Sequence, residues 1–589
     1  MRMGSNAVDG TFLLRPKGPS PVAAAVSSPP RAAAALNSPR SRHVESAVLA
    51  AAVAVGAVLR FVNLGGIGLN SDEAVYAAQS ASLAGNPHFT SMFPVVRAHP
   101  LLMQVTLSPF YLHGVPDSAG RYVGAAFGLG TVVLVYILGR VLYDGRTGAV
   151  AALLLAVMPY HMTISREIML DGPMTFFSTG SLICLAVAAR TSRGRWLIAA
   201  GGCLGLAALS KETAIVLLGS GFVFLALSSR QWRPVRFPLL GAALAVLLAL
   251  SYPMLTALAG GSRTSDSYLL WQLSRTPNHS LTFYLTSVGS SVGYFLLAVA
   301  AGGLFRRGAF DWRATLLLSW IVVPFVFFEV WPVKGFSYLL LCTPAVALLA
   351  GRALARPLPS ARPIVGRVAV VAVAVLCAAS LLVPAVRDLT RQPTAGLAGA
   401  SGTPGGRETG RWVAANLPAD ARLLTIGPSM ANLIEYYSGR VADGLSVSPN
   451  PLHRNPSYQP VRNADAALRT GQFQYVVWDT YSARRSTYFG NRAVTLAERF
   501  DGRPVFVQRD HNGARLVVVY KVTPSASAAA RAPAQATQPA IRQPNRLVLY
   551  LGYAAAILVA LASIGWAALS GRRGPTGRRR RPIFRGGRR

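Results

Sequence analysis

Charged residues are scarce in this chain, and acidic residues are the scarcest of them. Only 14% of the 589 residues are charged, 22 Asp+Glu stand against 58 Lys+Arg, and 52% are apolar. Soluble globular domains carry about 25% charged residues, so this composition excludes a soluble enzyme and indicates a chain largely surrounded by lipid. The four cysteines all lie in apolar stretches, which indicates no disulfide framework.

Lysine and several catalytic motifs are also nearly or wholly missing. Only four of the 58 basic residues are lysines, and many arginines form short clusters between apolar stretches. This distribution is typical of membrane topology and does not indicate a nucleic-acid partner. No lysine follows a glycine, so a P-loop and an ATP-driven pump lack support. The eight histidines never form HExxH, and no Asp-x-Asp occurs, which argues against a zincin protease and against the usual metal clamp for a nucleotide sugar.

Long apolar runs make up much of what is present. A span needs about 20 apolar residues. The predicted spans are 44–64, 119–142, 147–164, 172–189, 237–258, 281–305, 314–331, 336–351, 368–386 and 547–569. Residues 196–228 are too long for one span at about 1.5 Å per residue, and Lys211-Glu212 lies at their middle. We therefore predict two short helices there and about twelve transmembrane helices in all.

The arginine distribution predicts the orientation of these helices. With a cytoplasmic N-terminus, the inner loops hold fifteen arginines, whereas the short outer loops hold six basic residues, in agreement with the positive-inside rule. We expect a multi-pass protein of the cytoplasmic (plasma) membrane with both termini cytoplasmic. Its parts are a disordered tail 1–43, a transmembrane domain 44–386 with a first outer loop 65–118, an extracytoplasmic domain with linker 387–545, a last span 546–570 and a basic tail 571–589.

The extracytoplasmic segment alternates between helical and extended patterns. ETGRWVAANLP and MANLIEYYSG favour helices, whereas ARLLTIG, QYVVWD and RLVVVYKV favour strands. The fold class is therefore an α-helical polytopic membrane protein with a small extracytoplasmic α/β domain. A polar cluster follows one predicted strand at Asp479, Tyr481, Arg484 and Arg485, and such clusters are more often solvated loops than sites.

Acidic residues open the first outer loop. In LNSDEAVYAAQ, Asn70 or Ser71 can cap a helix that begins at Asp72-Glu73, and Asp72 shares a helix face with Tyr76. An isolated pair of this kind most often stabilises a helix N-terminus. Carboxylates beside hydrocarbon are costly, however, and tend to mark function. The pair is therefore a candidate site.

Further ionisable groups are predicted on the same side of the membrane. They are Arg97, His99, Arg166, Glu167, Asp171, Lys211, Glu212 and Lys334, with Tyr338 nearby. Each taken alone is explained by snorkelling or by pairing at a helix end. Together they predict an anion-binding rim beside carboxylates. Transfer of a sugar from a lipid phosphate needs both, because cations stabilise the departing phosphate and a carboxylate accepts the acceptor's proton.

Several of these motifs resemble a known superfamily. DEAVYA, AHPLL, RYVGAAFG, SREIMLDGP, LSKETA and KGFSYLLLCTPAVALLAG over residues 44–352 resemble the GT-C glycosyltransferases that use polyprenyl-phosphate sugars. Within that superfamily the likeness is to the protein O-mannosyltransferase and lipid A aminoarabinose transferase group (glycosyltransferase family 39 type).

The resemblance implies roles for individual residues. It makes Asp72 the catalytic base, Glu73 the second acid, Tyr76 an aromatic residue near the sugar, and Asp171 a further acidic residue of the site. His99 falls at the start of the family's His-Pro-Pro, where some members carry a phosphate-binding lysine, although this chain reads His-Pro-Leu. Some members bind a divalent metal, and no clear ligand set for one is found in this sequence.

These observations lead to one hypothesis and two alternatives. We expect an inverting glycosyltransferase that moves a monosaccharide, hexosyl or pentosyl, from a polyprenyl-phosphate donor to a cell-envelope acceptor on the outer face. Arg97, His99, Lys211 and Lys334 are the expected phosphate ligands, with Arg166, Tyr76 and Tyr338 as further donor-site candidates. One alternative is a lipid-linked sugar flippase, although the paired broken helices of transporters are not found. The other makes the spans an anchor for the outer domain.

Overall fold

The computed structural model describes residues 39–112, 114, 116–228, 234–262, 272–273, 275, 277–305, 310–355, 363–390, 402–446, 460–524 and 541–570. The chain divides into two compact units, Met1–Ala47 and Val48–Arg589, and the candidate site lies within the second. Residues 1–38 of the predicted tail 1–43, residues 525–540 of the predicted linker and the predicted tail 571–589 lie outside the described residues.

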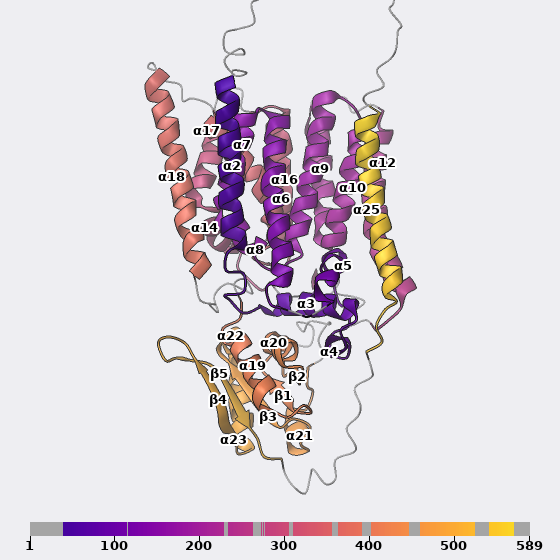
Figure 1. The fold of residues 1–589 in the computed structure, drawn as a ribbon, viewed down its shortest axis with the longest axis vertical. Coiled ribbons are helices and arrows are strands. Elements are labelled where there is room, and N and C mark those ends of the chain that lie inside the picture. The colour runs from indigo at the N-terminus through magenta and orange to yellow at the C-terminus, as the bar shows by residue number, and fades with distance from the viewer. Residues whose placement is uncertain are drawn as a thin grey trace, which may run out of the picture. The chain divides into compact units, whose positions relative to one another are not determined.

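Seven helices in the described part of the chain are long and apolar enough to cross a membrane, and each coincides with a predicted span. They are α2 (Pro39–Phe61), α6 (Ala119–Leu142), α9 (Asp171–Thr191), α12 (Arg236–Ala259), α16 (Trp312–Val330), α18 (Pro363–Thr390) and α25 (Arg546–Leu569). Figure 1 shows these helices running roughly parallel to one another. The arrangement confirms a polytopic helical protein.

Two more predicted spans are bent pairs of helices. They are α7 (Gly145–Val157) with α8 (Pro159–Ser165), and η4 (Tyr284–Val288) plus α14 (Gly289–Val292) with α15 (Tyr294–Leu304). The first pair bends by 64° at Pro159, because proline has no N–H for the preceding helix to bond. The second bends by 89° at Gly293, whose φ of +98° suits a residue without a side chain.

The apolar run around Lys211 is broken, as predicted. Helix α10 (Arg195–Ser210) ends there, Lys211 is extended, and the 3-10 helix η3 (Glu212–Ile215) leads into α11 (Val216–Leu227). A third short apolar stretch joins η5 (Leu340–Cys342) to α17 (Thr343–Ala355). The prediction of two short helices meeting at a charged pair is confirmed. The total of twelve spans stays a prediction, because helices of 10–17 residues fall short of a ~30 Å core.

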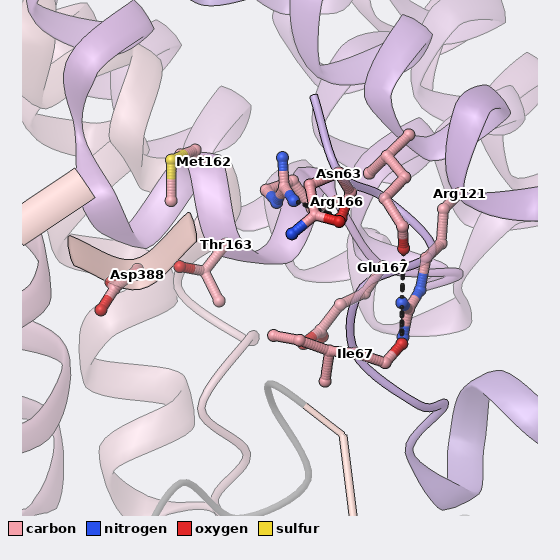
Figure 2. A pocket seen from close by; sticks show the side chains of 9 residues that line it. Asn63, Ile67, Arg121, Met162, Thr163, Arg166, Glu167 and Asp388 are labelled. Atoms are coloured by element: carbon pink, nitrogen blue, oxygen red, sulfur yellow. Dashed lines mark hydrogen bonds between the residues drawn. The ribbon is translucent and has the colours of Figure 1, made fainter. Parts of the chain in front are cut away.

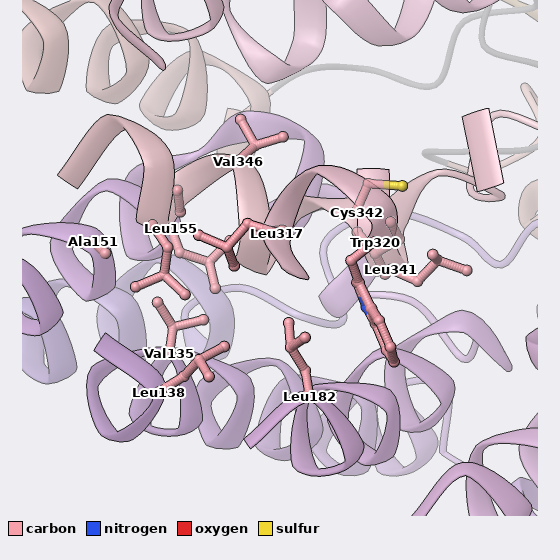
Figure 3. Close-up of a cluster of buried hydrophobic side chains, with 14 of the residues drawn as sticks. Val135, Leu138, Ala151, Leu155, Leu182, Leu317, Trp320, Leu341, Cys342 and Val346 are labelled. Atoms are coloured by element: carbon pink, nitrogen blue, oxygen red, sulfur yellow. The ribbon is translucent and has the colours of Figure 1, made fainter. Parts of the chain in front are cut away.

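Glycines allow the helices to approach closely. A Cβ atom on Gly139 of α6 would overlap the Cα of Gly148 in α7, and one on Gly201 of α10 would overlap the carbonyl oxygen of Gly241 in α12. Transmembrane helices associate largely through such close contacts, since lipid gives no hydrophobic drive between them. Buried apolar side chains, Trp320 among them, fill the space between the helices (Figure 3).

The first outer loop folds into four short helices. They are α3 (Ser71–Ala84), α4 (Pro87–Thr90), α5 (Leu102–Leu107) and the 3-10 helix η2 (Ser108–Tyr111). Figure 1 shows α3 lying across the ends of the long helices. The loop is tied to the last span, because the Leu101 amide donates to the Tyr553 hydroxyl of α25 at 2.7 Å. This contact fixes the loop that carries the predicted acidic pair.

A five-stranded mixed sheet lies between α18 and α25 in the sequence. Its order is β2-β1-β3-β5-β4, with β1 parallel to β2 and β3, and β5 antiparallel to β3 and β4. The strands are β1 (Arg422–Thr425), β2 (Val441–Gly444), β3 (Tyr475–Asp479), β4 (Arg503–Arg509) and β5 (Arg515–Lys521). The helices are α19 (Gly406–Asn416), α20 (Pro428–Ser438), α21 (Ala464–Arg469), α22 (Thr480–Arg485) and α23 (Thr487–Arg499).

The five elements predicted for this segment, here called the outer domain after its predicted side of the membrane, are confirmed as α19, β1, α20, β3 and β5. β2 and β4 are the two edge strands, and the sequence did not predict them because β2 (VADG) has no run of apolar residues and β4 is largely exposed. Two buried clusters contain side chains from the sheet, with Leu424 in one and Leu423 in the other. The alternation of neighbouring strand residues between the faces of a sheet explains this division.

Candidate functional site

The acidic pair of the first outer loop begins α3, as predicted. Asn70 is the N-cap, and its side chain accepts hydrogen bonds from the amides of Asp72 and Glu73 at 2.9 Å. Glu73 completes a capping box by accepting a hydrogen bond from the Asn70 amide at 3.0 Å. The two neighbouring carboxylates lie in different surroundings: Asp72 is exposed, whereas Glu73 is fully buried.

Glu73 forms a buried ion pair with Arg121 of α6. Arg121 donates from Nε to Glu73 Oε1 at 2.7 Å and from Nη2 to Oε2 at 2.6 Å, and the Ile168 amide also donates to Oε1 at 3.0 Å. The remaining Arg121 donors bind the carbonyl oxygens of Leu64, Ile67 and Gly68. A carboxylate with all these donors is held rigidly. The catalytic role of Glu73 stays a prediction, and its contacts favour a structural one.

Asp72 has none of these restraints on its carboxylate. Within the described residues, no hydrogen bond or ion pair engages its side-chain oxygens. The capping box and the Glu73–Arg121 pair fix the backbone on either side of it. Asp72 is therefore a solvent-accessible carboxylate on a rigid support, which suits a general base.

Asp171, at the start of α9, forms the second buried ion pair. Lys211 donates to its two carboxylate oxygens at 2.9 and 2.8 Å, and both side chains are nearly inaccessible to solvent. The Lys211 ammonium also lies 4.5 Å from the centroid of the Tyr338 ring. Three predicted site residues from distant parts of the sequence therefore meet. An ammonium group has three donors, so the pairing with Asp171 leaves one available to a ligand.

His99 and Glu212 form a third pair beside this one. His99 Nδ1 lies 2.9 Å from Glu212 Oε1 and 3.0 Å from Oε2. The His99 ring makes an edge contact with Tyr76 of α3, with centroids 6.3 Å apart. The side chains of the pair are 15% and 21% exposed, so solvent reaches them. This contact joins the AHPLL motif to the LSKETA motif and to the helix of Asp72.

Lys334 lies in the loop between α16 and η5 and is paired with Glu329. Its ammonium is 3.6 Å from Glu329 Oε1 and also contacts the Glu329 carbonyl oxygen. Asn278 holds the Lys334 backbone, with its Oδ1 accepting from the amide at 2.7 Å and its Nδ2 donating to the carbonyl at 3.0 Å. The ammonium is 5.7 Å from the ring centroid of Tyr284.

Arg166 and Arg97 are placed differently from the other predicted phosphate ligands. Arg166 donates to the carbonyl oxygens of Leu59 and Val62 at 2.8 Å, which satisfies carbonyls at the end of α2. It lines a small cavity of about 40 Å³ together with Arg121 and Glu167 (Figure 2). Arg97 acts electrostatically on Glu435 of α20 in the outer domain. Their role as phosphate ligands stays a prediction.

A chain of contacts joins Tyr338 to the acidic groups. Tyr338 lies in the loop before η5, and its ring packs against the Lys211 ammonium that pairs with Asp171. Glu212 follows Lys211 in the chain, and the Glu212–His99 pair contacts Tyr76 on the helix that carries Asp72. The first loop, the α9 start and the α10–α11 break therefore form one site. No group of three His, Cys, Asp or Glu side chains able to hold a metal occurs in the part of the chain described.

The outer domain contacts the segment of the chain that precedes Asp72. The Tyr437 hydroxyl of α20 accepts from the Leu69 amide at 3.0 Å and donates to Asp117 at 3.1 Å. Asn432 Nδ2 donates to the Ser71 hydroxyl at 3.0 Å. Burial raises the pKa of Tyr437, so the hydroxyl keeps its proton and remains a donor. Sequence reasoning missed these residues because side-chain contacts between distant segments leave no local pattern.

Comparisons with known proteins agree with this architecture. Residues 98–256 match the family model described as dolichyl-phosphate-mannose-protein mannosyltransferase. The apo structure of ArnT from Cupriavidus metallidurans has a TM-score of 0.60 at 17% identity, covering 84% of this chain and 100% of that chain. The same protein bound to undecaprenyl phosphate has a TM-score of 0.57 at 18% identity, covering 80% and 97%. The chain has the GT-C fold.

A further GT-C structure, the Archaeoglobus fulgidus oligosaccharyltransferase tethered with an acceptor peptide, has a TM-score of 0.50 at 14% identity, covering 87% of this chain and 77% of that one. No match is found among curated proteins. The resemblance to GT-C glycosyltransferases inferred from the sequence motifs is confirmed. The GT-C fold and the apolar helices make this chain a polytopic membrane protein.

Arg121 and Tyr284 are site-flanking residues of this GT-C chain that sequence reasoning did not select. Arg121 had a detectable signal, because an arginine two residues inside an apolar helix requires an acidic or carbonyl partner. Tyr284 had none, because an aromatic residue in an apolar segment is most often part of the core.

Proposed function

We propose that this protein is an inverting glycosyltransferase that uses a polyprenyl-phosphate monosaccharide as its donor. The observation that carries the proposal is the contrast among the three predicted catalytic carboxylates. Glu73 and Asp171 are buried in ion pairs, whereas Asp72 is exposed at the edge of the same site. The undecaprenyl phosphate bound to ArnT, a structure of the same fold, supports a lipid phosphate as the leaving group.

In the proposed reaction Asp72 accepts the proton of an acceptor hydroxyl. The acceptor oxygen then forms a bond to the anomeric carbon while the bond from that carbon to the phosphate oxygen breaks. The leaving polyprenyl phosphate carries the negative charge that develops, and the third Lys211 donor stabilises it. Asp171 fixes the direction of that ammonium, and Tyr338 packs beneath it. A single displacement inverts the configuration at the anomeric carbon.

We propose that the site faces the outer side of the cytoplasmic membrane, with both termini in the cytoplasm. The arginine-rich loops at the other ends of the helices support this orientation. The outer domain and the first loop then lie on the side where cell-envelope acceptors are found. A screen of lipid, glycan and protein acceptors would identify which class of acceptor receives the sugar.

The test is a donor panel. Purified protein in lipid nanodiscs is incubated with undecaprenyl-phosphate hexoses and pentoses, with and without a cell-envelope extract as acceptor. We expect release of undecaprenyl phosphate with one class of donor, and a marked increase when the extract is present. A flippase would instead move intact donor across proteoliposomes without releasing undecaprenyl phosphate, and that result would overturn the proposal.

A further inference from the structure

A cleft opens between the first outer loop and helices α19 and α20 of the outer domain. Its volume is about 440 Å³, and residues from both sides line it, among them Phe89, Asp117, Ser118, Arg411 and Tyr437. Figure 1 shows α20 beside α3, and the two helices are in contact. Ligand sites commonly lie at such boundaries between domains and have volumes of this order. The proposed reaction uses none of the residues that line the cleft.

Three aromatic side chains line the cleft. Phe89 comes from the first loop, whereas Tyr436 and Tyr437 are neighbours on α20. The ring centroids of Phe89 and Tyr436 lie 5.5 Å apart, and those of Tyr436 and Tyr437 lie 5.1 Å apart with the rings nearly perpendicular. Rings in such contact hold one another in place. The aromatic lining is therefore formed before a ligand arrives.

The charged groups of the cleft compensate each other. Asp117 accepts a hydrogen bond from the Tyr437 hydroxyl at 3.1 Å, and its carboxylate lies 3.7 Å from Arg411 Nη2. Arg407 lies 3.9 Å from the same carboxylate, but its guanidinium donates to the Gly65 carbonyl oxygen at 2.8 Å. Among the described residues that line the cleft, Asp117 and Arg411 are the charged ones. The cleft therefore has no net charge and does not favour an anion.

Polar groups of the cleft are available to a ligand. The Arg411 side chain is 64% exposed, and its distance from Asp117 is too long for a hydrogen bond. Ser118 is the N-cap residue of α6, yet its side chain makes no capping hydrogen bond. Its hydroxyl can therefore donate and accept. Together the guanidinium, the hydroxyl and the carboxylate offer both donors and acceptors.

This lining suits a sugar better than it suits a lipid chain or a protein. The apolar face of a sugar ring packs against aromatic side chains, and each sugar hydroxyl donates and accepts, which matches a neutral set of donors and acceptors. A hydrocarbon chain would leave the charged groups without partners. A folded protein partner needs an interface of about 800 Å² on each side, which a cleft of this size does not provide.

Helix α20 connects the cleft to the proposed base. Asn432 donates from Nδ2 to the hydroxyl of Ser71, the residue before Asp72, at 3.0 Å. Tyr437, in the cleft, follows on the same helix about 7.5 Å further along the axis, at a rise of about 1.5 Å per residue. A sugar unit held in the cleft therefore lies on the order of 10 Å from Asp72. Further units of the same glycan can bridge that distance.

We propose that this cleft binds a neutral glycan, which is the acceptor of the transferred sugar. The inference rests on the proposed function and deepens it, because it names the class of acceptor. Arg411, Ser118 and Asp117 bind sugar hydroxyls, the aromatic side chains pack against a sugar ring, and the end of the glycan reaches Asp72. The cleft recognises the acceptor and takes no part in the bond changes at the anomeric carbon.

The experiment compares Arg411→Gln with Arg469→Gln, an exposed arginine at the end of α21 that does not line the cleft. A cell-envelope extract is separated into a lipid fraction, a protein fraction and a neutral glycan fraction that has been delipidated and digested with protease. Each fraction is added to the full-length protein in nanodiscs together with the undecaprenyl-phosphate donor that is active in the donor panel. Release of undecaprenyl phosphate is measured against the concentrations of acceptor and donor.

We expect the glycan fraction to be the active acceptor. Arg411→Gln should raise the KM for this fraction about tenfold, the effect of losing a hydrogen bond to a charged group, while the KM for the donor stays at its wild-type value. Ser118→Ala should raise the KM for the glycan about threefold, since it removes a neutral hydrogen bond. Arg469→Gln should change each value less than about twofold. A thermal unfolding scan checks that the variants fold.

The other outcomes separate the inference from the proposed function. If the glycan fraction is active but Arg411→Gln and Ser118→Ala keep the wild-type KM for it, the cleft is not the acceptor site and the inference is wrong. Acceptor activity confined to the lipid or the protein fraction overturns it as well. Both results leave the proposed function standing. Absence of release with every donor and fraction would contradict the proposed function itself, and the inference with it.

Discussion

The helix bundle and the outer domain use charge in different ways. At the end of the bundle that carries α3, charged groups are joined in compact pairs, such as Glu73–Arg121 and Asp171–Lys211. On α22 of the outer domain, arginines are exposed. Burying a charged side chain costs much free energy unless an opposite charge pairs with it. The paired side chains of the bundle therefore mainly fix its geometry. In the proposed reaction, chemistry is left to the exposed Asp72 and to the one Lys211 donor that Asp171 does not bind.

The largest loss of stability is expected from breaking a buried ion pair of the bundle, which would test whether these pairs are structural. Arg121→Met leaves the Glu73 carboxylate buried without its partner and also removes three contacts to backbone carbonyls. We expect a loss of about 3–5 kcal/mol in stability, measured as a large fall in the apparent Tm in detergent. The matched control is Arg492→Met, a half-buried arginine on α23 that forms no ion pair within the described residues. An unchanged Tm for Arg121→Met would mean that the pair is not a structural element.

A smaller effect is expected where the outer domain holds the first loop. Tyr437→Phe removes one acceptor for the Leu69 amide and one donor to Asp117. We expect a loss of about 1–2 kcal/mol in stability and a fall in kcat with KM for the donor little changed, because the loop that carries Asp72 loses its position. Tyr488→Phe, on the exposed start of α23, is the control. If kcat and Tm stay at wild-type values, the outer domain does not position the loop.

The smallest effect is expected from the titration of Glu435 in α20. Burial, with the nearby charge of Asp443, raises the pKa of Glu435 to about 8. The unfolded chain releases this proton from about pH 4.5 upward and the folded one keeps it until about pH 8, so stability falls as pH rises between these values. Because the side chain is partly exposed, we expect less than about 1 kcal/mol per pH unit. Glu435→Gln should flatten the Tm-against-pH curve there; an equal slope in both proteins would contradict the assignment.

The sequence predicts the membrane helices well because hydrophobic length is a local property. Even the break at Lys211 followed from two charges in a run too long for one span. The Asn70 cap and the start of α3 were also readable, since a cap and its helix are neighbours in the chain. These features depend on a few adjacent residues.

The partners of the site residues could not be read in the same way. Pairing of His99 with Glu212, or of Lys334 with Glu329 rather than with Asp171, depends on how the helices pack. The polar cluster after β3, predicted as a solvated loop, is instead the short helix α22, in which Asp479 is the N-cap and both Asp479 and Tyr481 are buried. Contacts between segments hundreds of residues apart are set by the tertiary fold alone.

The most direct test of the account is the transfer rate of Asp72→Asn beside that of Asp420→Asn, an exposed aspartate outside the site. The rate is measured as acceptor-dependent release of undecaprenyl phosphate by the protein in nanodiscs. The account predicts that Asp72→Asn loses roughly 10²–10⁴-fold in rate while its Tm and its binding of undecaprenyl phosphate stay close to those of Asp420→Asn. An Asp72→Asn protein that transfers at the wild-type rate would contradict it.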